Sequence, residues 1–261
     1  MYQNPLYLSE TATERSLNSN IVSKIPTGLR NLTLGGTFYG SITQNIIANR
    51  FTTLTTLDLS RGGGPYFHPD SVDSNCELPN VRNTCQTYNV NGNDFRAFGT
   101  SSGSNLNVKD LTNLVSLSLS GNYYLSDGSF SLASNNSVIQ SVDISSTGLS
   151  CPDLNGKTSL TTFYGYYCRN IGSIFTGSNI YKFNGCSSLS TLYFYASPLT
   201  GAMPKFTNSS LSYLELRYTA ITGGNINGDN TYVIPEKTFE LSPNLQYCLK
   251  IGRAHVWTPV T

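Results

Sequence analysis

Charged residues are scarce in this chain. Asp, Glu, Lys and Arg make up 12% of its 261 residues, about half of the roughly 25% that is usual in globular domains. The formal net charge is only +1, which argues against a nucleic acid as partner, because proteins that bind polyanions carry clusters of Lys and Arg. Ser, Thr, Asn and Tyr must therefore supply most of the polar surface, as is typical of β-proteins exposed outside cells or on virions.

Histidines and long apolar runs are also nearly absent. The chain has two histidines, of which His255 falls in a C-terminal segment that we exclude below, and His68 follows a Gly-Gly-Gly-Pro turn. The carboxylates are scattered, so no pattern predicts acid–base catalysis, an activated nucleophile or a histidine-rich metal centre. We expect no enzyme, no cofactor and no metal site. No apolar run approaches the roughly 20 residues that span a bilayer, so we expect no membrane insertion of this segment.

A short motif dominates what is present. Residues 114–125 read LVSLSLSGNYYL and match LxxLxLxxNxxL at every fixed position, the motif of leucine-rich repeats. The LxxLxL core, with aromatic, β-branched or Cys substitutes, recurs at steps from 21 residues (Ile139 to Leu160) to 34 residues (Leu211 to Leu245). The cores are Leu29/Leu32/Leu34, Leu54/Leu57/Leu59, Cys85/Tyr88/Val90, Leu114/Leu117/Leu119, Ile139/Val142/Ile144, Leu160/Phe163/Gly165, Leu189/Leu192/Phe194, Leu211/Leu214/Leu216 and a broken ninth from Leu245, with Leu6 and Leu8 fitting an earlier one.

The chain resembles leucine-rich repeat proteins in two further ways. Stretches such as LTGAMPKF (199–206) are similar to the LTGxIPxx segment of repeats whose return arm is extended rather than helical. Three residues after each core comes the position that holds Asn in this family, where the side chain satisfies backbone groups as the chain leaves the strand. Here this position is filled by Asn93, Asn122, Cys168, Thr37, Thr147, Ser197 and Thr219, all able to hydrogen-bond, though Cys only weakly.

This resemblance implies an all-β-leaning repeat solenoid. Each L-x-L pair is a short strand, and a coil buries its apolar edge only by stacking on its neighbours. Because Ser, Thr, Asn, Gly and Pro dominate between the cores, long helices are disfavoured. We therefore predict short parallel concave strands and irregular, mostly non-helical convex loops. Residues 1–249 should form a single solenoid of about nine to ten irregular repeats, truncated relative to the natural protein.

The C-terminal end does not continue the pattern. Residues 251–261 read IGRAHVWTPVT, and their back-translation, with TGA for Trp257, resembles a common sequencing-library adapter. Trp257 is the only Trp of the chain, and the core that begins at Leu245 stops at this junction. We treat residues 250–261 as a non-native tail, which has no place in fold reasoning.

Six cysteines and one loop are candidates for a disulfide, a zinc site or a phosphate site, but their sequence context favours none of these. Cys85 and Cys248 occupy core leucine positions and Cys168 the Asn position, which favours small buried thiols; a bridge between Cys76 and Cys85, which flank a long insertion, is the alternative. The remaining cysteines are Cys151 and Cys186, and no CxxC spacing or nearby His predicts zinc. The stretch NGKTS (155–159) is similar to the end of a phosphate-binding loop, but it lacks the first Gly and a preceding buried strand.

The residues before, between and after the two inward-pointing residues of each L-x-L pair should point out of the concave sheet. Each repeat therefore displays one short row of three side chains on that face. The first five rows are small and polar, for example Ser116/Ser118/Ser120. Tyrosines gather in the last three rows, and such a cluster is a typical recognition surface because Tyr combines a rigid apolar ring with a hydrogen-bonding tip. The plain alternative is that cross-strand Tyr pairs only stabilise the sheet. The candidate ligand-binding residues are Tyr164, Tyr166, Tyr193, Tyr195, Tyr213, Glu215 and Arg217.

A narrower resemblance bears on function. Residues 186–224, rich in Ser and Tyr, resemble the irregular repeats in structural proteins of marine tailed phages. The resemblance implies a virion or cell-surface location and a non-enzymatic module of a tail fibre or adhesin that binds a protein or a cell-surface glycan, or other fibre subunits. Two alternatives remain open: a purely structural fibre spacer, and an intracellular leucine-rich repeat scaffold, which free core thiols would favour. Fold alone does not decide among them.

Overall fold

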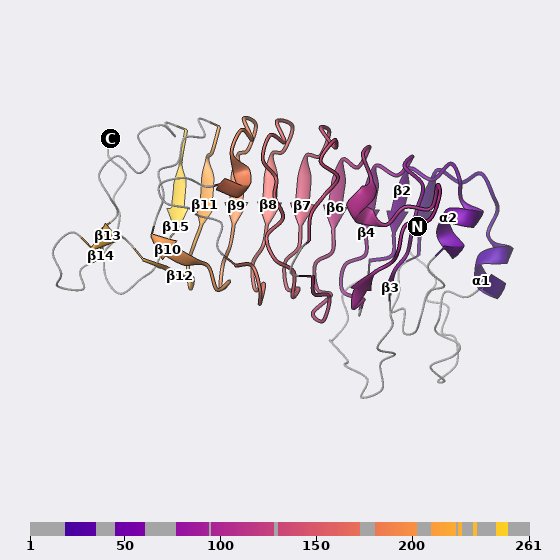
Figure 1. Ribbon diagram of the computed structural model, residues 1–261, viewed down its shortest axis with the longest axis horizontal. Helices are drawn as coiled ribbons and strands as arrows, with labels where there is room; N and C mark the ends of the chain where they lie inside the picture. Colours follow the sequence, from indigo (N-terminus) through magenta and orange to yellow (C-terminus); the bar gives the residue numbers. More distant parts are fainter. Residues whose placement is uncertain are drawn as a thin grey trace.

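The computed structural model of the chain describes residues 19–34, 45–60, 77–93, 95–127, 130–172, 181–202, 210–222, 224–225, 232–233 and 244–249. Figure 1 shows an elongated solenoid whose short strands stand side by side along the long axis. Nine of them form one parallel sheet in the order β1-β2-β4-β6-β7-β8-β9-β11-β15, which confirms the predicted all-β repeat solenoid. Their bounds are β1 (Asn31–Thr33), β2 (Thr56–Asp58), β4 (Thr87–Asn89), β6 (Ser116–Ser118), β7 (Ser141–Asp143), β8 (Thr162–Tyr164), β9 (Thr191–Tyr193), β11 (Tyr213–Glu215) and β15 (Tyr247–Leu249).

The register of this sheet is the one that the LxxLxL cores predict. In each strand the second core residue is central and pairs with the second core residue of the next strand, for example Leu117 with Val142 and Phe163 with Leu192. The broken ninth core is a strand too, since Cys248 pairs with Leu214. The earlier positions Leu6 and Leu8 and the tail 250–261 lie outside the described residues.

The core is a single stack of inward side chains. In the nine-stranded sheet, the central residue of each strand from β2 to β11 is at most 1% exposed, and a buried leucine contributes roughly 1.5–3 kcal/mol relative to an exposed one. Where the motif departs from leucine, the packing compensates. Tyr88 is fully buried and its hydroxyl donates to the Pro79 carbonyl at 2.9 Å, so its polar tip is satisfied.

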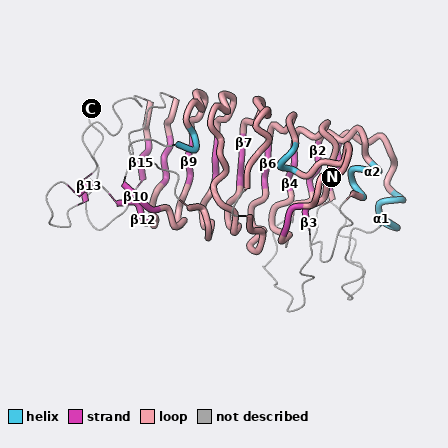
Figure 2. Tube along the Cα trace, in the orientation of Figure 1, coloured by secondary structure: helices cyan, strands magenta, loops and turns pink. Residues whose placement is uncertain are grey.

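The remaining elements are short, and most of the chain between the sheet strands is loop and turn (Figure 2). As expected from the composition, no long helix occurs in the described part of the chain. Two return arms pair as extended strands, β10 (Thr200–Ala202) with β12 (Ala220–Thr222), as the LTGxIPxx-like stretches predict. The others are α1 (Ser19–Lys24), α2 (Ile46–Arg50), η1 (Val108–Asp110), η2 (Tyr181–Phe183), the parallel pair β3 (Glu77–Leu78) and β5 (Ala97–Phe98), and the antiparallel pair β13 (Gly224–Asn225) and β14 (Tyr232–Val233).

A polar spine runs along the positions that leucine-rich repeat proteins, which the sequence resembles, fill with Asn. Apart from Thr37, which lies outside the described residues, each predicted side chain donates to the backbone carbonyl of a residue at the third position of an LxxLxL core. These bonds are Asn93 to Leu59 (2.8 Å) and Val90 (3.0 Å), Asn122 to Val90 (3.1 Å) and Leu119 (2.7 Å), Thr147 to Ile144 (2.6 Å), Cys168 to Ile144 (3.1 Å), Ser197 to Gly165 (2.5 Å) and Thr219 to Leu216 (2.8 Å). The predicted role of this position is therefore confirmed.

One residue before the spine, the backbone turns through the left-handed region. Gly92 and Gly121 have φ of 70° and 76°, and a Cβ on Gly121 would lie 3.1 Å from the Gly92 backbone. In the later repeats the same corner is made by non-glycine residues, Ser146, Tyr167, Ala196 and Tyr218, with φ between 52° and 57°. This conformation is uncommon for residues with a side chain, and it turns these side chains out at the carboxyl ends of the strands.

The described thiols belong to the core. Cys85, Cys151, Cys168 and Cys186 are free and buried, so Cys85 is not bridged to Cys76. Burial raises the pKa of Cys85 and of Cys168 to about 12. These thiols stay protonated at neutral pH, as the hypothesis of small buried thiols requires.

Candidate ligand-binding face

The seven predicted residues all lie on the outward face of the sheet at β8, β9 and β11, where Glu215 alone is fully buried. Tyr164 ends β8, Tyr193 ends β9, and Tyr213 and Glu215 belong to β11. Tyr166, Tyr195 and Arg217 follow two residues after the ends of these strands. Parallel in-register pairing sets equivalent residues of adjacent repeats side by side, for example Tyr164 next to Tyr193.

These side chains surround a shallow pocket of about 510 Å³. Its lining, which we call the tyrosine pocket, consists of Tyr164, Tyr166, Tyr167, Tyr193, Tyr195 and Arg217. Five of these six residues were predicted from the sequence, and Tyr213 and Glu215 support them from β11. The structure therefore brings the whole predicted set together.

Tyr193 is the centre of the ring contacts. Its ring centroid lies 5.5 Å from that of Tyr166 and 6.0 Å from that of Tyr164, both near edge-to-face. On its other side Tyr213 stacks nearly parallel at 5.9 Å. Ring pairs in these arrangements stabilise one another beyond their buried area, so the pocket wall is fixed before any ligand arrives.

The two charged residues of the face neutralise each other. The Glu215 carboxylate is fully buried and accepts from Nε and Nη2 of Arg217 at 2.9 and 2.7 Å, as well as from its backbone N–H. This bonding raises the pKa of Arg217 further above its ordinary value. The guanidinium also lies over Tyr195, 5.3 Å from the ring centroid. The pocket thus presents a positioned guanidinium plane without a net charge from this pair.

Two tyrosines of the cluster were missed by the sequence prediction. Tyr167 and Tyr218 occupy the left-handed corners, where their rings meet Tyr195 edge-to-face at 5.4 and 5.1 Å. They are among the most exposed aromatic residues described, at 52% and 63%. The signal that could have found them is their alignment with Gly92 and Gly121, since a glycine at this repeat position marks a corner that faces outward.

Two phenols of the cluster, Tyr195 and Tyr213, are neutral donors and acceptors at physiological pH. The pKa of Tyr195 is raised, first by hydrogen bonding with the Tyr167 side chain. Burial, followed by the nearby Glu215 charge, raises the pKa of Tyr213. Both therefore keep their protons well above neutrality and offer hydroxyl groups rather than phenolate charges.

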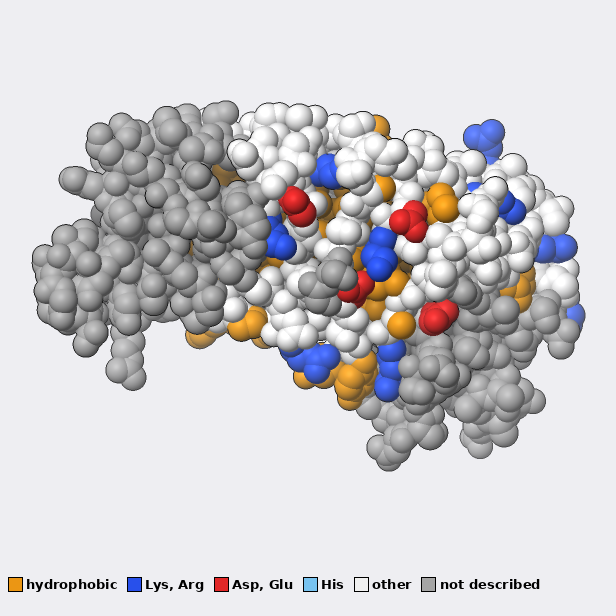
Figure 3. Space-filling view, viewed as in Figure 1, with side chains coloured by type: hydrophobic (Ala, Val, Ile, Leu, Met, Phe, Trp, Pro, Cys, Tyr) orange, Lys and Arg blue, Asp and Glu red, His pale blue; other side chains and the backbone are white. Residues whose placement is uncertain are grey.

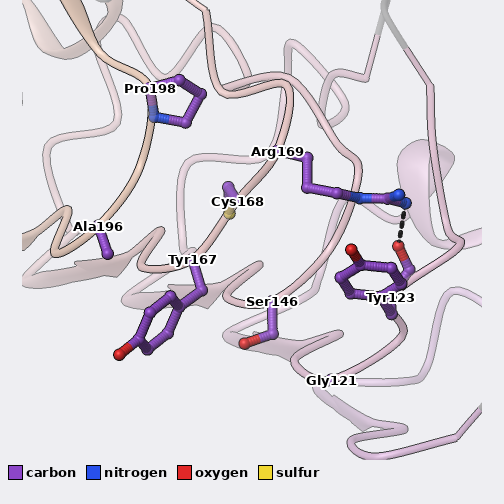
Figure 4. Close-up of a pocket in the computed structure, with 8 residues that line it drawn as sticks. All are labelled: Gly121, Tyr123, Ser146, Tyr167, Cys168, Arg169, Ala196 and Pro198. Carbon is purple, nitrogen blue, oxygen red and sulfur yellow. Dashed lines mark hydrogen bonds between the residues drawn. The ribbon is translucent and has the colours of Figure 1, made fainter. Parts of the chain in front are cut away.

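A second hollow, which the sequence did not predict, lies along the left-handed corners. This corner groove has a volume of about 680 Å³ and includes Tyr123, Ser146, Tyr167, Arg169, Ala196 and Pro198 in its lining. Figure 4 shows Tyr123 and Tyr167 on opposite sides, with Ser146 between them and Arg169 beside Tyr123. Tyr167 also lines the tyrosine pocket, so the two hollows share one wall.

The loop that is similar to a phosphate-binding loop has a structural role. Lys157 is 4% exposed and its ammonium group donates to the carbonyls of Ala133, Ser134 and Asn136 at 2.7–2.9 Å. All three of its protons are thus engaged, and burial lowers the pKa of this lysine. Lys157 holds a turn of the preceding repeat in place and is not available to a phosphate.

The described part of the face seen in Figure 3 shows few concentrations of charge. On the side seen in Figure 3, acidic and basic side chains are interspersed among uncharged ones. Within the described residues, no group of three or more His, Cys, Asp and Glu side chains could hold a metal ion. The helices described are also too short to cross a bilayer.

No model of a known protein family matches this chain, and no curated protein matches its sequence.

Proposed function

We propose that this chain is a non-enzymatic binding module of the leucine-rich repeat class that recognises a cell-surface glycan or protein through the tyrosine pocket. The observation that carries the proposal is the pocket itself, five tyrosines and one arginine around about 510 Å³ on an otherwise small and polar sheet face. Exposed aromatic clusters of this kind are typical of interfaces, where Tyr and Arg contribute most of the binding free energy. In line with the phage resemblance, we assign the module to a tail fibre, a virion structural protein or a surface adhesin.

The chemistry of the pocket favours a glycan over a protein ligand. A sugar ring has a C–H face that packs on an aromatic ring and hydroxyl groups at its rim that need hydrogen-bonding partners. Every lining side chain of the tyrosine pocket combines a flat face with a polar tip. Among the described residues of this lining, none carries the aliphatic side chain that a protein ligand with apolar anchors would require.

The main alternative is a structural spacer, and one observation favours it. The tyrosine rings contact one another across β8, β9 and β11, and cross-strand aromatic pairs by themselves stabilise sheets. An intracellular scaffold is the third candidate, compatible with the four free buried thiols. A spacer needs the rings for stability alone, whereas a binding module needs their exposed faces for its ligand.

Replacing Tyr164, Tyr193 and Tyr195 together with Ser is expected to abolish glycan binding while the far-UV circular dichroism spectrum barely changes. These side chains are only partly buried, and none supplies a core position. Binding is measured on an array of immobilised glycans and polysaccharides. The matched control replaces Ser116, Ser118 and Ser120 with Ala, on the same face of a polar repeat, and should bind like the native chain.

Two results would contradict the proposal. The native chain could bind no glycan on the array and no cell surface, which would leave the spacer. Alternatively, the triple tyrosine variant could bind as well as the native chain, which would place the ligand elsewhere.

A further inference from the structure

The corner groove exists because the residues at successive corners differ in size. Gly121, Ser146 and Ala196 are small and leave a hollow where the chain turns, whereas Tyr167 stands between them as a wall. Tyr123 and Pro198 also line the groove. The groove is therefore built from the variable corner position of four repeats and is independent of the leucine core.

Arg169 is the charged group of this groove, and it is held in place. Its guanidinium lies over the Tyr123 ring at 3.9 Å from the centroid, a cation–π arrangement, and Nη2 donates to the Tyr123 carbonyl. Arg169 is exposed. Among the described residues, no carboxylate forms a salt bridge with it, and the bond to Tyr123 leaves its remaining N–H donors available for a ligand.

The two neighbouring hollows thus differ in charge. In the tyrosine pocket, Glu215 neutralises Arg217 through a bidentate pair. In the corner groove, Arg169 stacks on a neutral ring and keeps its positive charge. An unpaired, preorganised guanidinium is the donor that suits the two oxygens of a carboxylate or sulfate group. Tyr167 separates the two hollows and contributes to both.

We propose that the corner groove binds the anionic group of an acidic glycan, with Arg169 contacting the carboxylate or sulfate while a neighbouring sugar packs in the tyrosine pocket across Tyr167. This inference rests on the proposed glycan-binding function and names its ligand class. The shared chemistry is a saccharide oxyanion, whether a uronate or a sulfate ester. An acidic protein is the competing ligand that the experiment can reveal.

The test compares the native chain with three arginine variants and with the triple tyrosine variant on neutral and acidic polysaccharides. The probes are dextran, dextran sulfate and alginate, which supply a neutral glucan, its sulfated form and a polyuronate. The native chain should bind one of the acidic probes more tightly than dextran, and Arg169→Gln should weaken that binding by about tenfold or more, as loss of a charge-assisted contact does. Arg169→Lys should keep part of the preference. Arg30→Gln removes an exposed arginine at the other end of the solenoid and should leave binding unchanged.

The arms separate the two proposals. Three results overturn the corner-groove inference alone, provided the triple tyrosine variant has lost binding. Arg30→Gln and Arg169→Gln could weaken binding equally, or Arg169→Gln could keep the full preference for the acidic probe. The native chain could also bind dextran as tightly as it binds the acidic probes. Binding to an acidic protein but to none of the three polysaccharides also overturns it. Glycan binding that survives the triple tyrosine variant overturns the proposed function. Preference for alginate identifies a carboxylate, and preference for dextran sulfate identifies a sulfate. Arg169→Gln should have a thermal unfolding midpoint close to that of Arg169→Lys. Such a result would show that the substitution acts on binding and not on folding.

Discussion

Replacing Asn122 with Ala is expected to lower the free energy of unfolding by about 3 kcal/mol, since a buried polar group left unpaired costs about 1–3 kcal/mol. Asn122 is fully buried and donates to the carbonyls of Leu119 and Val90 at 2.7 and 3.1 Å. Its side-chain oxygen accepts from the backbone N–H of Phe95 at 3.1 Å. One side chain thus satisfies three backbone groups in two repeats, and alanine satisfies none of them.

The measurement is urea unfolding followed by circular dichroism. Asn113→Ala is the matched control, because Asn113 is exposed and donates only to the Asn83 carbonyl; we expect it to change stability by about 0.5 kcal/mol or less. If both variants unfold at the same urea concentration, the polar spine has no special part in holding the repeats together.

Replacing Gly165 with Leu, which restores the consensus core, is expected to destabilise the fold by about 3 kcal/mol, at the upper end of the usual cost of overpacking. A Cβ at this position would lie 2.9 Å from the ring of Phe163 and 3.2 Å from that of Phe194. Together with Phe183, these rings fill the space that a leucine occupies in other repeats, with centroids 5.1–6.3 Å apart. The absence of a side chain at Gly165 therefore makes room for these three rings.

Thermal and urea unfolding check this expectation against Ile144→Leu, a change to leucine at the same position of the preceding repeat. Ile144→Leu conserves volume and should cost about 1 kcal/mol or less. Adding Phe163→Leu to Gly165→Leu shrinks the clashing ring and should recover part of the lost stability. A Gly165→Leu protein as stable as the native chain would show that the aromatic cluster does not fill this site.

The strand register could be predicted because two periodicities agree. Alternation within each L-x-L pair fixes which residues point inward, and the repeated core fixes which residues of successive coils pair. Even strands without leucine at the centre follow the rule, as Tyr88 and Phe163 do. The rows on the exposed face follow from the same register, which is why Tyr164, Tyr193 and Tyr213 were found from the sequence alone.

The corners were missed because they depend on backbone conformation rather than on alternation, and only their alignment with Gly92 and Gly121 signals them. Nothing in the residue type of Tyr167 or Tyr218 announces a left-handed φ, which side chains rarely adopt. The corner groove depends in turn on these corners and on Arg169 folding back over Tyr123 from a neighbouring repeat. Likewise, the sequence placed Glu215 and Arg217 on the face but did not reveal that they neutralise each other.

This difference matters for function. Leucines and the polar spine explain why the coils stack, and they would do so for any ligand or for none. Recognition, in this account, depends on the variable positions between and after them, where tyrosines replace the serines of the earlier repeats and where one arginine keeps its charge. The same frame could carry other ligands through changes at these positions alone.

The most direct test of the central claim is an NMR titration of the protein, with ¹³C-labelled tyrosine rings, against the glycan that binds most strongly on the array. The ring signals of Tyr164, Tyr166, Tyr193 and Tyr195 should shift on binding. Tyr88, fully buried in the core, should not shift and serves as the internal control. Saturable glycan binding with no change in these four rings would contradict the assignment of the tyrosine pocket as the ligand site.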